Sequence, residues 1–303
     1  EELLAIYEAL RAGKKPALPP APPYRLFIEW LARRDPETSR QFWSKCLAGS
    51  PGPASVPGTN LAGRERGYAL AEHIFLLDRE TTAALASLAA RHGLTMNCLL
   101  QTAWAALLGS YNLSPDVVFG AVVSGRPPEL QDIERMVGLF LQTIPVRIRL
   151  DKEQPFLDLA RQVQRAAGAC EPHHHFPLDE MQMLDGVQRP LFDHVLVFEN
   201  YPLAAGSLPM GWQIEDVRGF EQMHYDFSVV IHPGKQIEVK FTFNAHVLAR
   251  EQCQRLEEHL RSILSGVLRS ERARLGDLEM RPDETGSRLT AETAVSMLPW
   301  PEI

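Results

Sequence analysis

Val117-Val118-Phe119-Gly120-Ala121-Val122-Val123 is an apolar run that stops at the turn Ser124-Gly125-Arg126-Pro127-Pro128. A polar segment then leads to Val137–Arg147, a second mostly apolar run that continues to Leu150. Glycine permits positive φ, whereas proline fixes φ and lacks an amide hydrogen, so the chain must break between the two runs. The pattern predicts two buried strands joined by a polar turn. From local sequence alone, a surface turn is favoured over one that presents Arg126 to a cavity.

The composition limits the classes of partner. Of 303 residues, 45% are hydrophobic and 23% are charged, as in ordinary globular proteins with a sizeable core. A net charge of -7 without a long basic run argues against nucleic acid. No apolar run is long enough to cross a membrane, and the four cysteines lack metal-ligand spacing. We therefore expect a cytoplasmic protein with reduced thiols and no metal, nucleic-acid or membrane partner.

Helical and strand patterns alternate along the rest of the chain, which predicts an α/β layered fold. Helices are expected near residues 3–12, and then over Tyr24–Trp30, Pro36–Leu47, Arg79–His92, Met96–Tyr111, Pro155–Ala167 and Ala249–Leu268. Asp78 and Thr95 are the expected caps of the helices that follow them. Further strands are expected over His73–Leu77, Phe192–Phe198, Asp226–His232 and Gln236–Asn244.

Two features of the N-terminal region concern domain organisation. The chain opens at Glu1 inside a helical pattern, without a methionine or a signal-like segment, so we expect a piece of a longer polypeptide. Lys14–Pro23 is rich in proline and predicts a stiff, extended linker.

Several short motifs follow one another in an order that one known family shares. They are Tyr24–Trp30, Ser124-Gly125-Arg126, Val137–Arg147, His173–Asp179, Arg189–Asp193, Phe198–Pro202 and His224–Phe227. In this order they resemble motifs of the condensation domain of nonribosomal peptide synthetases, within the chloramphenicol-acetyltransferase-like superfamily. Gln142 departs from that family, which usually has asparagine there.

The resemblance implies a two-layer α/β sandwich of chloramphenicol-acetyltransferase-like type, mainly the C-terminal lobe of a condensation domain. Residues 1–13 would be the last helix of the N-terminal lobe, 14–48 a linker with interlobe helices, 49–280 the C-terminal lobe and 281–303 a tail or linker. The family's catalytic His-His-x-x-x-Asp-Gly motif lies upstream of the Tyr…Trp motif. We therefore expect the catalytic histidine in a lobe that precedes this chain, and no catalytic residue within it.

The implied reaction is amide formation between a carrier-bound donor acyl thioester and an acceptor amine. Donor and acceptor carrier-protein domains and adjacent synthetase domains are the implied partners, and their phosphopantetheine arms take the place of a bound cofactor. The implied tunnel residues are Ser124, Gly125, Arg126 and Asn200. Structural or lobe-packing roles are implied for Tyr24, Trp30, Arg147 and Asp226. A non-catalytic carrier- or domain-docking lobe and an ester-forming acyltransferase of the same fold remain alternatives.

A second histidine motif imitates the catalytic one. His174, His175 and Asp179 are spaced as His-His-x-x-x-Asp, but Glu180 stands in place of glycine. The motif follows the Ser-Gly-Arg turn, and its proline matches a later family motif. Adjacent histidines rarely converge on one metal ion. We therefore expect a solvated or lobe-packing turn there, and we expect a bare lobe interface to make the isolated chain associate.

Overall fold

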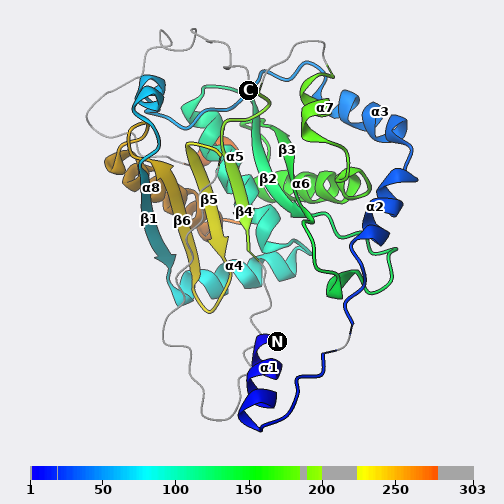
Figure 1. The fold of residues 1–303 in the computed structure, drawn as a ribbon. Coiled ribbons are helices and arrows are strands. Elements are labelled where there is room, and N and C mark those ends of the chain that lie inside the picture. The colour runs from blue at the N-terminus through cyan, green and yellow to red at the C-terminus, as the bar shows by residue number, and fades with distance from the viewer. Residues whose placement is uncertain (1, 19, 185–189, 200–223, 279–303) are drawn as a thin grey trace.

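The structure is a computed structural model in which residues 2–18, 20–184, 190–199 and 224–278 are described (Figure 1). A single six-stranded sheet has the order β1-β6-β5-β4-β2-β3. Its strands are β1 (Leu70–Leu77), β2 (Asp116–Ser124), β3 (Leu141–Arg149), β4 (Val195–Phe198), β5 (Phe227–His232) and β6 (Ile237–Asn244). Strand β4 pairs in parallel with both β2 and β5, and the other pairs are antiparallel.

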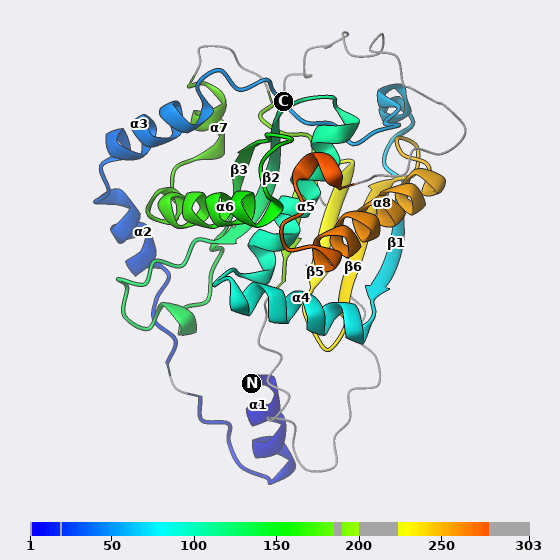
Figure 2. The same cartoon turned by 180° about the vertical axis from the view of Figure 1, so that it is seen from behind.

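Four helices form a layer on one face of the sheet (Figure 2). They are α4 (Arg79–Arg91), α5 (Met96–Tyr111), α6 (Phe156–Cys170) and α8 (Arg250–Arg269). The remaining helices among the described residues are α1 (Glu2–Arg11), α2 (Arg25–Ala32), α3 (Pro36–Leu47) and the short α7 (Leu178–Gln182), with short 3₁₀ segments at Leu61–Arg66, Ile133–Arg135, Glu171–His173 and Leu275–Asp277. The two-layer α/β prediction is confirmed.

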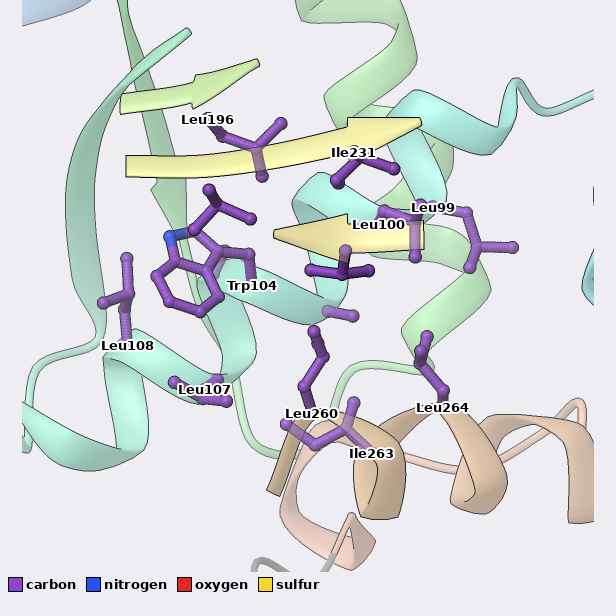
Figure 3. Close-up of a cluster of buried hydrophobic side chains, with 14 of the residues drawn as sticks. Leu99, Leu100, Trp104, Leu107, Leu108, Leu196, Ile231, Leu260, Ile263 and Leu264 are labelled. Atoms are coloured by element: carbon purple, nitrogen blue, oxygen red, sulfur yellow. The ribbon is translucent and has the colours of Figure 1, made fainter. Parts of the chain in front are cut away.

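Helix α5 is the centre of the main core. Its side chains Leu99, Leu100, Trp104, Leu107 and Leu108 are buried. Figure 3 shows them between the sheet residues Leu196 and Ile231 and the α8 residues Leu260, Ile263 and Leu264. A helix that is apolar nearly all round must be enclosed on both sides, as α5 is by the sheet and by α6 and α8.

Local chemistry sets where the core helices begin. The Asp78 carboxylate accepts from the Thr81 amide at 2.7 Å, and the Thr95 hydroxyl accepts from the Cys98 amide at 3.2 Å. Each bond satisfies an amide that has no partner inside its helix. Both predicted caps are confirmed.

A buried polar chain fastens α5 to the start of β4. The Trp104 indole N–H donates to His194 Nε2 at 3.0 Å, so the opposite ring nitrogen carries the hydrogen and donates to Asp193 Oδ1 at 2.8 Å. Burial acts to raise the pKa of Asp193, but the bonds from His194 and Ser55 hold it below its ordinary value. These hydrogen bonds satisfy the buried indole N–H of Trp104, which would destabilise the fold if it had no acceptor.

Several predicted boundaries were wrong. Strand β3 begins at Leu141 and not at Val137, because Gly138 lies against the Tyr24 ring and Phe140 turns inward to pack on α2. Strand β4 begins at Val195 and not at Phe192, which lies in a buried bend. Strand β1 begins earlier than predicted, at Leu70, and α7 was not predicted.

Helix α1 stays accessible in the part of the chain that the structure describes. None of its residues is buried, and Leu3 and Leu10 expose 78% and 62% of their surface. It is joined to α2 through the proline-rich segment Lys14–Pro23, whose described residues form neither helix nor strand. No described helix combines the length and the apolar character that a membrane crossing requires.

Candidate functional site at the end of strand β2

Strands β2 and β3 pair along their whole length and close at a tight turn. Ser124 is the partner of Leu141 in the register, and the Gly125 amide then donates to the Phe140 carbonyl at 2.7 Å. A Cβ at Gly125 would lie 2.5 Å from that carbonyl oxygen, so only glycine allows the approach. The β2–β3 loop, residues 125–140, therefore leaves the sheet and returns to it at one point.

Arg126 holds this loop together from inside. Its Nη1 donates to the carbonyls of Ile133 and Met136, the latter at 3.1 Å. The guanidinium carbon stands 4.0 Å from the centroid of the Phe140 ring. The Phe140 ring face and the two carbonyl acceptors therefore already interact with the guanidinium, through its charge and its N–H groups. The structure thus assigns the Arg126 side chain to its own loop and leaves the exposed Ser124 at the strand end.

Helix α2 covers the far side of the loop. The Tyr24 hydroxyl donates to the Leu139 carbonyl at 2.7 Å, and the Tyr24 and Phe140 rings meet edge to face at 5.3 Å. Phe27 contacts Phe140 at 4.8 Å. Trp30 lies one turn further along α2, with the Arg34 guanidinium 4.1 Å from its ring. Tyr24 and Trp30 therefore both pack where α2 meets the rest of the molecule.

Arg147 lies deeper, at the opposite end of β3 from the turn. It donates to both carboxylate oxygens of Asp116, at 2.9 and 2.6 Å. It also donates to the carbonyls of Cys46, Ala48 and Gly49 at the end of α3. A planar guanidinium suits such a two-pronged contact.

Asp226 directly precedes the first residue of β5. Its carboxylate accepts from Arg64 Nε at 2.5 Å and from Asn244 Nδ2 at 3.0 Å. Burial raises the pKa of the nearby Tyr68 hydroxyl, and the negative charge of Asp226 raises it further. Asn200, the fourth expected tunnel residue, lies outside the described residues.

Two of the three consecutive histidines contact helices α2 and α3. His173 stacks on Phe42 of α3 at 4.1 Å, and its Nδ1 lies 3.0 Å from the Ser39 hydroxyl. His175 meets Trp30 edge to face at 5.8 Å, with Nε2 3.4 Å from the same hydroxyl. Burial lowers the pKa of His174, whereas the charge of Glu171 and the backbone of Ser124 act to raise it. We call His173–His175 the histidine joint.

The geometry does not assemble a catalytic pair from the imitation motif. Asp179 is exposed at the start of α7, and within the described ranges it forms no ion pair with His174 or His175. Burial lowers the pKa of all three histidines. Among described residues, no group of three histidine, cysteine or acidic side chains is placed to hold a metal ion.

Two important residues of the site were missed from the sequence. Phe140 is the ring under Arg126, and Ser39 is the hydroxyl between two histidines. A helix pattern cannot single out Ser39, since its partners lie more than a hundred residues away. The pairing of Phe140 with Arg126 had no local signal either, because it depends on the path of the loop between them.

Comparison with known proteins gives one consistent result. The family model of the Condensation domain matches residues 1–290. Surfactin synthase subunit 2 of Bacillus subtilis is 36% identical over 274 residues, which is 88% of this chain and 8% of that protein. Gramicidin S synthase 2 of Brevibacillus brevis is 32% identical over 307 residues, covering 99% of this chain and 7% of that protein. The chain thus spans a small part of each relative.

Solved structures show the same fold at low sequence identity. The X-domain from teicoplanin biosynthesis matches with a TM-score of 0.74 and 23% identity, covering 92% of this chain and 67% of that one. The first condensation domain of the CDA synthetase matches with a TM-score of 0.70 and 18% identity, covering 91% of this chain and 61% of that one.

Proposed function

This chain belongs to the condensation-domain family of nonribosomal peptide synthetases, and on that basis we propose that it provides one lobe of an amide-forming acyltransferase. The donor is an acyl thioester and the acceptor is an amine, each held on the phosphopantetheine arm of a carrier-protein domain. The amine attacks the thioester carbonyl, the C–N bond forms and the C–S bond breaks. The proton lost by the amine goes to the leaving thiolate, so no external reactant is needed.

The observation that carries this proposal is the fixed turn at the end of β2. Ser124 is exposed there, while its neighbours Gly125 and Arg126 are tied to Phe140, Ile133 and Met136. A rigid wall that holds two long substrates in line lowers the entropy cost of their meeting. In this proposal Ser124 and Gly125 line the wall and Arg126 keeps it in shape, while the histidine that manages the proton comes from a preceding lobe.

The surface beside Ser124 suits contact with such a lobe. Val137, Leu139 and Leu141 expose 73%, 74% and 51% of their surface, and Leu141 is the register partner of Ser124. Exposed apolar side chains gathered at one place mark a contact surface. The proposal places the preceding lobe over this edge, so that the reacting groups lie between the two lobes.

A docking function is the second candidate. One structure with the same fold is described as a complex of the X-domain and OxyB from teicoplanin biosynthesis, so this fold also serves to bind another protein. A lobe of this kind would bind carrier or neighbouring domains without forming a bond. An assay for condensed product distinguishes the two candidate functions, because docking alone leaves both thioesters intact.

The test is an amide-formation assay on the full synthetase module from which the chain derives. Donor and acceptor carriers are loaded, and the acceptor arm is analysed by mass spectrometry with the module and with this chain alone. Condensed product from the module only supports the proposal. Carrier binding without product favours docking, and an ester product favours the related acyltransferase. Product from this chain alone that is abolished by His175→Ala would place the catalytic centre at the imitation motif instead.

A further inference from the structure

We propose that Glu199 is a catalytic residue supplied by this lobe, and that His232 holds its carboxylate in place. In this scheme the carboxylate accepts a hydrogen bond from the acceptor amine and stabilises the positive charge that the nitrogen gains as it attacks the thioester. The inference rests on the proposed function, since it takes the Ser124 strand end as part of the substrate-facing wall. It adds a second group to the histidine expected from the preceding lobe.

The first step is the common edge of three strands. Strand β4 is parallel to its neighbours β2 and β5, so all three end at the same edge of the sheet (Figure 1). Strands β2 and β4 are paired up to Val122 and Val197, and Ser124 and Glu199 each follow two residues later. Because side chains alternate with a period of two, both project from the face that carries Val122 and Val197. Open sheets bind their ligands at the carboxyl ends of parallel strands.

The second step is that Glu199 is held against β5 and β6. Its amide donates to the Ile231 carbonyl at 2.9 Å, so the backbone ladder continues one residue past β4. His232 follows Ile231, and its Nε2 lies 2.8 Å from Oε2 of Glu199. The Nδ1 atom of the same ring lies 3.3 Å from Oε1 of Glu238, the register partner of His232 on β6. The imidazole thus stands between two carboxylates from neighbouring strands, which fixes the Glu199 side chain.

The third step is the chemistry of a carboxylate at this place. The Glu199 side chain is accessible but mostly shielded, with 22% of its surface exposed. A carboxylate has two oxygens, so contact of one with His232 leaves acceptor capacity for an amine N–H. As a neutral amine forms the C–N bond, its nitrogen becomes positive until the proton passes to the leaving thiolate. A fixed carboxylate stabilises this charge more than it stabilises the neutral amine, and more strongly where water is partly excluded.

The first test compares Glu199→Gln with Glu199→Asp in the full module. Glutamine keeps the size of the side chain and removes its charge, whereas aspartate keeps the charge. We expect Glu199→Gln to lower kcat by about a hundredfold with little change in the KM for either carrier, because the charge acts in the transition state. Glu199→Asp should recover part of that loss. Glu72→Gln is the matched control, since this glutamate lies on β1 at the far side of the sheet, 3.7 Å from Lys240, and its loss should leave kcat unchanged.

A second test asks whether His232 acts through Glu199. His232→Phe keeps a ring and removes both nitrogens, so we expect kcat to fall by about tenfold as the carboxylate loses its support. Added to Glu199→Gln, the same change should cost little further, because the group that His232 positions has already lost its charge. Losses that multiply in the double variant would overturn the positioning role of His232.

Thermal unfolding checks that each variant is folded before its kinetics are compared. Full activity in Glu199→Gln, or an equal loss in Glu72→Gln, overturns the inference and leaves the proposed function standing. Equal losses in the Gln and Asp variants also overturn it, because charge would then not be the property that matters. A higher KM with unchanged kcat would instead place Glu199 at a carrier-docking surface and overturn its catalytic role. A wild-type module that forms no amide overturns the proposed function and this inference together.

Discussion

Arg147 and Asp116 form a two-pronged ion pair across β2 and β3, with contacts of 2.9 and 2.6 Å, and the arginine side chain is only 9% exposed. The same guanidinium also donates to three carbonyls at the end of α3. One residue therefore joins the sheet edge to the helix that carries Ser39 and Trp43. The histidine joint depends on the position of that helix.

We predict that Arg147→Met lowers the free energy of unfolding by about 3 to 5 kcal/mol, because it leaves Asp116 and three carbonyls without their partner. Arg147→Lys should recover only part of the loss, since an ammonium cannot reach all of these acceptors at once. Urea unfolding followed by fluorescence measures both. Arg149→Met is the control: this neighbouring side chain is 73% exposed and 3.8 Å from Asp116, so its loss should cost under about 1 kcal/mol. Equal losses at 147 and 149 would contradict the argument.

Leu113 is held in an unfavourable backbone conformation on the surface. Its φ is 49° and it exposes 91% of its surface, directly after α5. At positive φ the Cβ atom of leucine crowds the backbone, which costs free energy, whereas glycine has no Cβ atom. We predict that Leu113→Gly raises the free energy of unfolding by about 0.5 to 1 kcal/mol, measured by urea titration. Asp132→Gly, at φ 56°, should give a smaller gain because aspartate tolerates this region better. A loss of stability in Leu113→Gly would show that the side chain makes a contact that offsets its strain.

The sequence predicted those features of the fold that depend on interactions between residues close together in the chain. Asp78 and Thr95 cap helices with atoms only three residues away, so both caps followed from the sequence. The start of β3 did not, because Val137 and Leu139 have the composition of a strand but are exposed in a loop. What decides there is the Tyr24 ring against Gly138, a contact between residues far apart in the chain.

The same limit applies to the candidate site. Motif order located the Ser124 turn and the histidine segment, yet it could not show that the Ser39 hydroxyl lies between the rings of His173 and His175. It also could not show what the Arg126 side chain contacts. In the structure the Arg126 guanidinium contacts the carbonyls of Ile133 and Met136 and the Phe140 ring. The path of the loop brings these partners to it.

The histidine joint predicts a dependence of stability on pH. Burial lowers the pKa of His173, His174 and His175 from the ordinary value of 6.5. The positive charge of Arg34 lowers that of His175 further, whereas Glu129 acts to raise it and Glu171 acts to raise that of His174. The unfolded chain therefore binds more protons than the folded one below this value. Stability is complete above the unfolded pKa and falls as the pH drops through it towards the lowered folded values.

We expect the urea concentration at the unfolding midpoint to decrease as the pH is lowered from about 7.5 to about 5.5. Ordinary carboxylates titrate below this range. A double variant, His173→Phe with His175→Phe, keeps rings against Phe42 and Trp30 but removes two protonation sites, and it should show a shallower dependence in that window. His224→Phe is the control, since His224 is exposed and lies outside the joint. An unchanged slope in the double variant would exclude the joint as its source.

The apolar edge beside Ser124 predicts the solution behaviour of the isolated chain. Val137, Leu139 and Leu141 expose three apolar side chains within five residues of one another, next to the turn where we place the preceding lobe. When that lobe is missing, two copies can bury this edge against each other, because apolar surface leaves water wherever it finds a partner. Sedimentation velocity should show association that rises with concentration, and Val137→Ser with Leu139→Ser should weaken it. Leu113→Ser removes a leucine that is more exposed but stands alone on another turn, so it should leave association unchanged. A monomer at every concentration, or equal weakening by both changes, would mean that this edge is not the contact surface.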